Sequence, residues 1–333
     1  MVYVQKTSDR QPEIQTIRTK ESMTSLKINP SVFVDMQYYQ GSEQSYSPQS
    51  SGAYVFRPDT TGRHSITNEP TITEVNGPLV NETIYTLDDW AVMTTRTYAD
   101  SDITEVTWQV GPISEGKEVV MVYKSELQAE DFYTDANGRQ MIRRVFTSDT
   151  EEDIAANYYP ITTRLELRSE ADKGGLTVIT DRSQGGSSLT TGELELMVHR
   201  QCLKDDGFGV GEALMEQAFG VGLVARGQHF VLSEAGYSLC EARLVQQEKV
   251  LTAQLSFLST SMSLDQWIQT QFTPHSGLNV QLPDSVQILT LSKWKSDDQV
   301  LIRFQHILAK VCNCLRQYSF SKIIYRMKEE GQN

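Results

Sequence analysis

Apolar and polar residues alternate with a period of two along most of the chain. In Val106–Val110, the apolar residues Val106, Trp108 and Val110 share one face. Because neighbouring side chains of a strand point to opposite faces, this alternation predicts half-buried strands of an antiparallel sheet. The same pattern predicts strands at Glu118–Lys124, Leu176–Thr180, Glu193–His199, His229–Ser233, Val286–Ser292 and Val300–Gln305.

Glycine-containing pairs separate the predicted strands and mark the turns between them. Glycine adopts a positive φ at little steric cost, as tight hairpins require. The predicted turns are Asn76-Gly77, Asn137-Gly138, Gly185-Gly186 and Asp206-Gly207.

Only one segment has clear helical periodicity. In Ala235–Leu251, the apolar residues Leu239, Ala242 and Val245 recur near helical spacing, with Glu and Gln between them. Helices do not alternate with strands along the chain, so we do not expect a parallel sheet. Around residues 247–260 the helix gives way to a second β-rich stretch, which predicts a domain boundary there. The predicted fold class is mainly β, a large sandwich plus a smaller C-terminal β domain with one helix between them.

The charge balance narrows the classes of partner. The formal net charge is −13, and a chain this acidic repels the phosphates of nucleic acid and of anionic membranes. No run of about 18 apolar residues is present, so we predict no membrane contact. Residues 1–15 lack the apolar core of a signal peptide, so we expect no secretory signal in the chain as written.

Residues that could support catalysis or metal binding occur without the spacing that such sites need. The glycines of Gly207–Glu212 lack the strand and helix that frame a dinucleotide loop. The five histidines have no His or Cys partner at the spacing of a zinc site. Adjacent acids such as Asp205-Asp206 suit a turn better than acid–base catalysis. Ordinary thiols are the simplest interpretation of Cys202, Cys240, Cys312 and Cys314. We therefore predict no catalytic residue and no metal site in this chain.

One stretch of the sequence indicates a function, because it resembles a known family. Residues 181–200, DRSQGGSSLTTGELELMVHR, are similar to the C-terminal β region of the lysosomal-type α-mannosidases, glycoside hydrolase family 38. The resemblance runs from about residue 45 to about residue 306. Other segments resemble the family in the same order along the chain, namely Gln49–Pro58, Trp108–Ile113, Gly116–Glu118, Asp131–Gly138, Asn157–Pro160, Asp205–Glu212, Arg226–His229 and Leu301–His306.

The resemblance implies an activity and a location. Such enzymes are retaining exo-α-mannosidases that act on N-glycan-derived mannosides through an aspartate nucleophile and a second carboxylate. A zinc ion binds the mannose hydroxyls in the full-length enzyme. The family places these aspartates and zinc ligands in an N-terminal catalytic domain, so we expect no cofactor in this chain and no activity from it alone. A lysosomal location is implied as well.

The resemblance also implies a division of the chain and a set of partners. We predict a lead-in segment at residues 1–45, a large galactose-mutarotase-like β-sandwich (supersandwich) at 46–250, and a smaller β domain with a diverged tail at 251–333. The implied partners are an α-mannosidase catalytic domain, on the same or a separate chain, and a mannose-containing oligosaccharide.

Four residues are candidate sites, each with a plainer alternative. By its place in the family pattern, Tyr54 is expected to border the sugar pocket, where its ring would stack on a sugar and its hydroxyl would hydrogen-bond. The alternative is a strand tyrosine in the core. Arg143 and Arg144 are expected to reach the same pocket or, alternatively, to form surface or interdomain ion pairs. Asn81 begins the one glycosylation sequon, Asn81-Glu82-Thr83. The loop Asp181–Leu189 is expected to form a structural turn at the interdomain contact.

Two hypotheses from different classes therefore stand side by side. The chain is either the rear part of an α-mannosidase or a free-standing, non-catalytic carbohydrate-binding or structural β module. A third possibility is a chain that docks on a separately encoded catalytic subunit. A surface that normally packs on a catalytic domain would leave an apolar patch exposed, so we expect solubility problems for the isolated chain.

Overall fold

A computed structural model provides the description of the chain. The residues that the structure describes are 13–18, 26–29, 32–43, 49–148, 152, 154–169, 174–207, 209, 211–233, 239–252, 254, 256, 257, 259, 261–270, 278, 281–283, 285–308 and 323–326. The chain divides into two compact units, Met1–Ser238 and Leu239–Asn333, which we describe separately.

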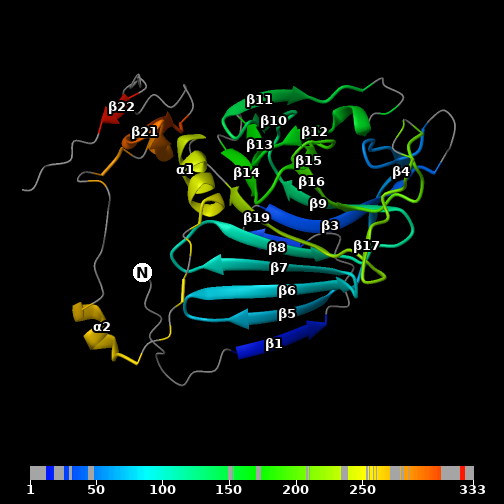
Figure 1. The fold of residues 1–333 in the computed structure, drawn as a ribbon. Coiled ribbons are helices and arrows are strands. Elements are labelled where there is room, and N and C mark those ends of the chain that lie inside the picture. Colours follow the sequence, from blue (N-terminus) through cyan, green and yellow to red (C-terminus); the bar gives the residue numbers. More distant parts are fainter. Residues whose placement is uncertain are drawn as a thin grey trace, which may run out of the picture. The chain divides into compact units, whose positions relative to one another are not determined.

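The first unit contains a ten-stranded antiparallel sheet, and Figure 1 shows several of its strands lying side by side. In spatial order its strands are β1 (Glu13–Arg18), β5 (Thr71–Asn76), β6 (Val80–Asp88), β7 (Ala91–Tyr98), β8 (Thr104–Val110), β19 (Ala225–Ser233), β14 (Gly174–Thr180), β13 (Arg164–Ser169), β10 (Asp131–Ala136) and β11 (Gln140–Val145).

A second, seven-stranded antiparallel sheet faces the first. Its strands are β12 (Tyr159–Ile161), β15 (Gln184–Ser187), β16 (Glu193–Arg200), β9 (Lys117–Ser125), β3 (Val32–Gly41) and β2 (Leu26–Asn29), with β4 (Pro58–Ser65) also paired to β3. A 3-10 turn, Ala155–Asn157, precedes β12. The strand β9 is covered on both faces, which explains why six of its consecutive residues are buried rather than every second one.

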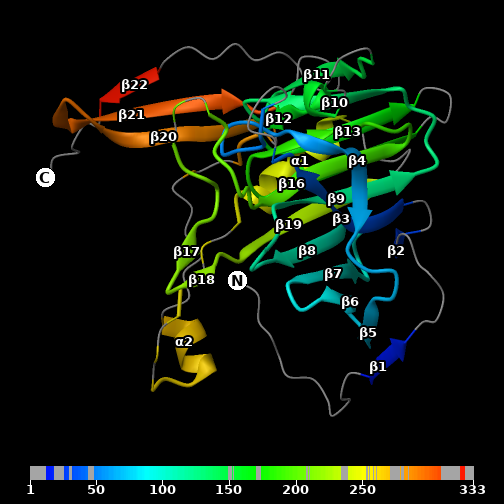
Figure 2. The same cartoon turned by 90° about the vertical axis from the view of Figure 1, so that its right-hand side faces the viewer.

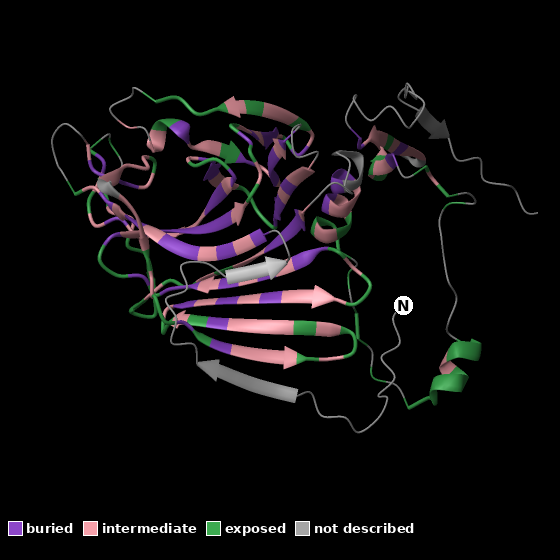
Figure 3. Ribbon diagram, turned by 180° about the vertical axis from the view of Figure 1, so that it is seen from behind, coloured by how far each residue is buried: buried purple, intermediate pink, exposed green. Residues whose placement is uncertain are grey.

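One hydrophobic core lies between the two sheets. Inward-facing residues of both sheets meet there, including Met36 and Tyr123 from the seven-stranded sheet and Met93, Trp108 and Leu165 from the ten-stranded one. Figure 3 shows the buried residues distributed along the strands of both sheets. Burial of apolar area between two packed sheets is the main stabilising contribution in such a fold. The predicted mainly-β sandwich is therefore confirmed.

A two-stranded hairpin, β17 (Gln217–Ala218) and β18 (Val221–Gly222), lies outside both large sheets. Figure 2 shows it beyond the ends of the strands of the ten-stranded sheet. Its turn contains Phe219 and Gly220, which both have positive φ.

The second unit contains two helices and a three-stranded sheet. The helices are α1 (Leu239–Val250) and α2 (Leu264–Thr270), and the strands are β20 (Val286–Trp294), β21 (Ser296–His306) and β22 (Ile323–Arg326). The Arg243 Nε atom donates to the carbonyl of Ile307 at 3.0 Å, and Leu244 packs on Ile307 and Leu308. These contacts join α1 to the chain that follows β21. No helix among the described residues has the length and apolar composition to cross a membrane.

The strand predictions and three of the four turn predictions are confirmed. Each predicted strand overlaps an observed one, and Asn137 and Gly138 both have positive φ, as a two-residue hairpin turn requires. The predicted turn at Gly185-Gly186 is wrong, because these glycines lie inside β15. A Cβ atom on Gly186 would lie 2.3 Å from the Ile161 side chain, so glycine is needed there for close packing rather than for a turn.

The helix prediction is confirmed for residues 239–250, and its first four residues lie outside the described ones. The short helix α2 was not predicted. The Ser263 hydroxyl accepts from the Gln266 N–H at 3.3 Å, and the Gln266 side chain accepts from the Ser263 N–H at 3.2 Å. This reciprocal capping box is the sequence signal that would have located α2. The strand β3 lies before residue 46, and the predicted division at residues 45 and 250 stays a prediction.

Candidate functional site: a turn fixed by a buried ion pair

Tyr54 lies at the tip of a tight turn between β3 and β4. Gly52 and Val55 exchange two backbone hydrogen bonds, of 2.9 and 3.3 Å, which leaves Ala53 and Tyr54 as the two residues of the turn. The Tyr54 side chain is 81% exposed. The alternative of a core tyrosine is therefore wrong, whereas its proximity to a sugar pocket stays a prediction.

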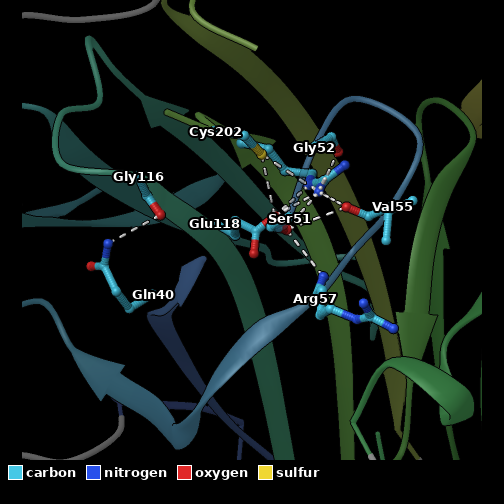
Figure 4. Close-up of polar contacts among 9 residues, drawn as sticks. Gln40, Ser51, Gly52, Val55, Arg57, Gly116, Glu118 and Cys202 are labelled. Atoms are coloured by element: carbon cyan, nitrogen blue, oxygen red, sulfur yellow. Dashed lines mark hydrogen bonds and ion pairs between the residues drawn. The ribbon is translucent and has the colours of Figure 1, made fainter. Parts of the chain in front are cut away.

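The turn lies on a buried ion pair. Glu118, which is fully buried in β9, accepts two hydrogen bonds from the Arg200 guanidinium at 2.9 and 2.6 Å. The same Glu118 oxygen accepts from the Ser51 hydroxyl at 2.7 Å, and Figure 4 shows Glu118 and Ser51 next to each other, near Gly52 and Val55 of the turn. Because neither charge could be buried alone without a large desolvation cost, each depends on the other.

Arg200 also binds the turn directly. One terminal nitrogen donates to the carbonyl of Gly52 at 3.0 Å and to that of Val55 at 2.8 Å. The Ser51 hydroxyl oxygen accepts from the Arg57 N–H at 3.0 Å. A planar guanidinium with several donors can fix two carbonyls and a carboxylate at once, so it determines the shape of the turn.

The other side of the turn packs on the predicted Asp206-Gly207 turn. A Cβ atom on Gly52 would lie 2.7 Å from the Asp206 Cβ atom, so only glycine allows this close approach. The Gln49 side chain donates to the Asp206 carbonyl. Asp205 accepts from the Gly207 N–H at 3.1 Å, and Gly207 has positive φ, which confirms a turn at these residues.

Cys202 lies next to the ion pair. Its sulfur atom is 3.6 Å from the Glu118 carboxylate and 3.6 Å from Arg200. Burial raises the pKa of the Cys202 thiol to about 11, so it stays protonated at neutral pH. It is a free, buried thiol, as predicted. The side chains of the other three cysteines lie outside the described residues.

Four of the segments that suggested the family meet at this turn. They are Gln49–Pro58, Gly116–Glu118, the end of residues 181–200, and Asp205–Glu212. The sequence alone did not single out Glu118 or Arg200. The two residues are partners because β9 and β16 pair in a register that places Glu118 opposite Arg200. Each is a charged residue at the end of a mostly apolar strand, and that is the one local signal for them.

A second buried carboxylate lies behind Phe56, the residue that follows the turn. Glu195 accepts from the Tyr39 hydroxyl at 2.9 Å, accepts from the Tyr158 hydroxyl, and lies 3.1 Å from the Arg63 guanidinium. Burial raises the pKa of Glu195 above its ordinary value, although Arg63 lowers it in part. The alternating pattern placed Glu195 on the polar face of its strand, but a cluster of Tyr39, Phe56 and other residues covers that face.

Arg143 and Arg144 lie on β11, at the edge of the ten-stranded sheet. The Arg143 Nε atom donates to Asp131 at 2.5 Å, and its side chain is 61% exposed. Arg144 donates to the Thr134 hydroxyl at 3.0 Å and lies 4.2 Å from the centre of the Tyr159 ring. Both arginines thus have hydrogen-bond partners on the neighbouring strand β10, and Arg144 also contacts Tyr159 of β12 in the seven-stranded sheet. Their reach toward a sugar pocket stays a prediction.

The remaining candidates lie elsewhere. Asn81 is exposed on β6, and its glycosylation stays a prediction. Gln184, from the loop of residues 181–189, contacts His229 at 2.8 Å, and His229 contacts the Tyr123 hydroxyl at 2.8 Å. These contacts connect the two sheets through the core. Burial lowers the pKa of His229 to about 3, so the ring is neutral. Among the described residues, no three His, Cys, Asp or Glu side chains are grouped as a metal site requires.

Comparisons with known proteins identify the family. The family model described as "Glycosyl hydrolases family 38 C-terminal domain" matches residues 5–208. The chain is 39% identical to the lysosomal alpha-mannosidase of Homo sapiens over 278 residues, which are 79% of this chain and 27% of that protein. It is 35% identical to the alpha-mannosidase of Canavalia ensiformis over 293 residues, covering 81% of this chain and 29% of that protein.

A solved structure is similar in fold. The alpha-mannosidase from Enterococcus faecalis V583 aligns with 82% of this chain and 33% of its own, at a TM-score of 0.50 and 11% identity. The chain thus spans less than a third of the length of the proteins that it matches. The match extends to residue 5, well before the motifs that first suggested it. The chain therefore belongs to glycosyl hydrolase family 38 and contains the C-terminal domain of that family.

Proposed function

We propose that the chain is the C-terminal β-sandwich portion of a retaining exo-α-mannosidase that acts on N-glycan-derived mannosides. It supports the sugar site and supplies no catalytic residue. The observation that supports this proposal most is the Tyr54 turn, in which an exposed aromatic residue projects from a backbone turn that a buried ion pair holds in place. A tyrosine has an apolar ring and a polar hydroxyl, so at such a position it can contact both the face and a hydroxyl of a sugar.

The turn would contribute by positioning. In a retaining exo-glycosidase two carboxylates perform the chemistry, and the enzyme gains rate by holding the sugar ring in the reactive geometry. Tyr54 would place its ring against an apolar face of the sugar and its hydroxyl against a sugar oxygen. Because Arg200 already fixes the carbonyls of Gly52 and Val55, little conformational entropy would be lost on binding.

The catalytic domain is the proposed partner, and the β17–β18 hairpin is the proposed contact with it. The hairpin and its flanks expose an unusual number of large apolar side chains: Met215, Phe219, Val221, Leu223 and Val224. A group of exposed apolar side chains like this is typical of a protein–protein contact. The zinc ion of the family would belong to the catalytic domain, and a lysosomal location follows from the same proposal.

The first test is the mass of the native protein, captured with an antibody against this chain. A longer polypeptide, or a copurifying chain that cleaves an aryl α-mannoside, is the expected result. A lone species near 37.6 kDa without activity would instead favour a free-standing module.

The second test is Tyr54→Phe and Tyr54→Ala in that native enzyme. We expect kcat/KM for an oligomannoside to fall about tenfold for Tyr54→Phe and further for Tyr54→Ala. The control is Tyr98→Phe, which removes a hydroxyl that donates to Glu105 at 3.0 Å on the other sheet. Equal activity of the Tyr54 and Tyr98 variants would refute a role for the turn.

A further inference from the structure

The ten-stranded sheet has a groove that the proposed function does not use. It has a volume of about 470 Å³ and lies over β7, β8 and β19. Seven of the residues that line it are polar, namely Thr94, Thr107, Gln109, Asp181, Arg182, Arg226 and Gln228. A groove of this size accommodates one or two sugar rings.

The groove opens on the face of the sheet that points away from the core. Along β8, Val106, Trp108 and Val110 are buried, whereas Thr107 and Gln109 between them are only partly buried. Apart from Val92, the outward side chains that line the groove are polar or charged. This composition suits a hydrated surface that can hydrogen-bond to a polar ligand.

Hydrogen bonds hold the rim of the groove together. Arg182 makes two hydrogen bonds to the Asp181 carboxylate, at 3.0 and 2.7 Å, and a third to the Arg226 carbonyl at 2.6 Å. Asp181 in turn accepts from the Gln228 N–H at 3.2 Å. The loop is thus joined to β19 at two points, so its polar groups are already placed for a ligand.

Beneath the groove, on the core side of the sheet, the packing of β19 depends on a glycine. A Cβ atom on Gly227 would lie 2.2 Å from the Trp108 ring, so only glycine lets β19 lie on this indole. Trp108 also lines the groove, and its buried indole N–H has no hydrogen-bond partner within the described part of the chain. Beside it, Arg226 donates through Nε to the Gln109 side chain at 2.8 Å. This bond fixes the guanidinium and leaves its terminal nitrogens available to a ligand.

The chemistry of the lining indicates an uncharged, hydroxyl-rich ligand. Neighbouring hydroxyls of a sugar act as donors and acceptors at once, and the lining offers amides, hydroxyls, a carboxylate and guanidinium groups to match. A phosphate or sulfate would meet the Asp181 carboxylate, which already neutralises Arg182. We propose that this groove is a saccharide-binding site, separate from the Tyr54 turn. The proposal goes beyond the function above, because it requires no catalytic domain.

The test is a titration of the full chain with methyl α-mannoside and with an α-linked mannobiose, observed by saturation-transfer NMR. We expect millimolar binding that weakens about three- to tenfold in Arg226→Ala and in Gln109→Ala. The control is Leu79→Ser, at an exposed leucine that does not line the groove, and this variant should bind as the unchanged chain does. The Tyr54→Ala variant distinguishes this groove from the Tyr54 turn.

Three results would overturn the proposal. The first is a folded chain that binds neither sugar, and the second is binding that is lost in Tyr54→Ala but retained in Arg226→Ala. The third is displacement of the sugar by millimolar inorganic phosphate, which would identify an anion site. Circular dichroism of each variant separates a lost site from a lost fold. Because the readout is binding to this chain, failure here leaves the mannosidase proposal intact, and the reverse holds as well.

Discussion

Glu118 illustrates how strongly single charged residues in this sandwich depend on partners that are distant in sequence. Local patterning predicted the strand around it correctly, yet neither its burial nor its pairing with Arg200 follows from the neighbouring residues. The same is true of Glu195, which the alternation placed on a polar face. The apolar period fixes which residues form strands, whereas the register between strands determines which charges meet. The family resemblance pointed to Tyr54 as a candidate residue, but it did not predict the ion pair beneath the turn.

The first prediction concerns this pair. Glu118→Gln should lower the free energy of unfolding by about 3 kcal/mol, because it leaves the mostly buried Arg200 charge without its carboxylate. The measurement is the urea midpoint of the chain.

Glu82→Gln is the matched control, since its ion pair with Arg96 is partly exposed. We expect Glu82→Gln to lower the free energy of unfolding by less than about 1 kcal/mol. Similar losses for the two variants would contradict the account of the turn.

The second prediction concerns pH. Burial depresses the pKa of His229 to about 3, below the ordinary value of 6.5, so folding favours its neutral form. The contribution of neutral His229 to the free energy of unfolding is fully present above pH 6.5, and it is lost as the pH falls from about 6.5 toward 3. The maximum slope is about 1.4 kcal/mol per pH unit. His229→Gln should remove this slope from a plot of unfolding free energy against pH.

Asp35 acts in the opposite direction. Burial raises the pKa of this carboxyl to about 6. The buried carboxylate lowers the free energy of unfolding at neutral pH, and this cost disappears as the group is protonated between about pH 6 and pH 4. Asp35→Asn should therefore steepen the acid-side loss of stability. A profile that neither variant changes would show that the two groups are more hydrated than the structure indicates.

At the scale of elements, the strands followed from alternation, and the errors arose where packing or capping decided the structure. Gly186 was expected in a turn but belongs to β15, because Ile161 occupies the space of a side chain. The helix α2 has too few residues for a periodic signal and was recognisable only through its capping box. The hairpin β17–β18 is too short to show any period at all.

The third prediction concerns that hairpin. Phe219→Ser should reduce concentration-dependent association of the isolated chain, because it removes the most exposed aromatic ring of the apolar patch. The stability should change by less than about 0.5 kcal/mol. Static light scattering across a concentration series measures the first effect. Leu79→Ser, at an exposed but isolated turn leucine, should leave association unchanged.

At the scale of the whole molecule, the fold class was predictable, but the organisation of the chain was less so. Alternating strands and the absence of strand–helix repeats were sufficient for a sandwich. The order of strands was not predictable, since β8 pairs with β19 across more than a hundred residues. The resemblance supplied the family, and the comparison extends it almost to the first residue.

The fourth prediction follows from the two compact units. A chain that ends at Ser238 keeps the whole core between the two large sheets. It should unfold in one cooperative transition, with a Tm within about 5 °C of the main transition of the full chain. Scanning calorimetry is the measurement. An unfolded product would show that the second unit is required for the sandwich.

The buried thiol beside the Tyr54 turn has a practical consequence. Cys202 is 2% exposed, so it can react with an alkylating reagent only when the structure around it opens locally. The rate of labelling of this cysteine, followed by mass spectrometry, therefore reports how often the structure around it opens. A sugar or a catalytic domain that binds to the turn would lower the rate of Cys202 labelling. The chain thus contains its own reporter of occupancy, which needs neither a chromophore nor enzymatic turnover.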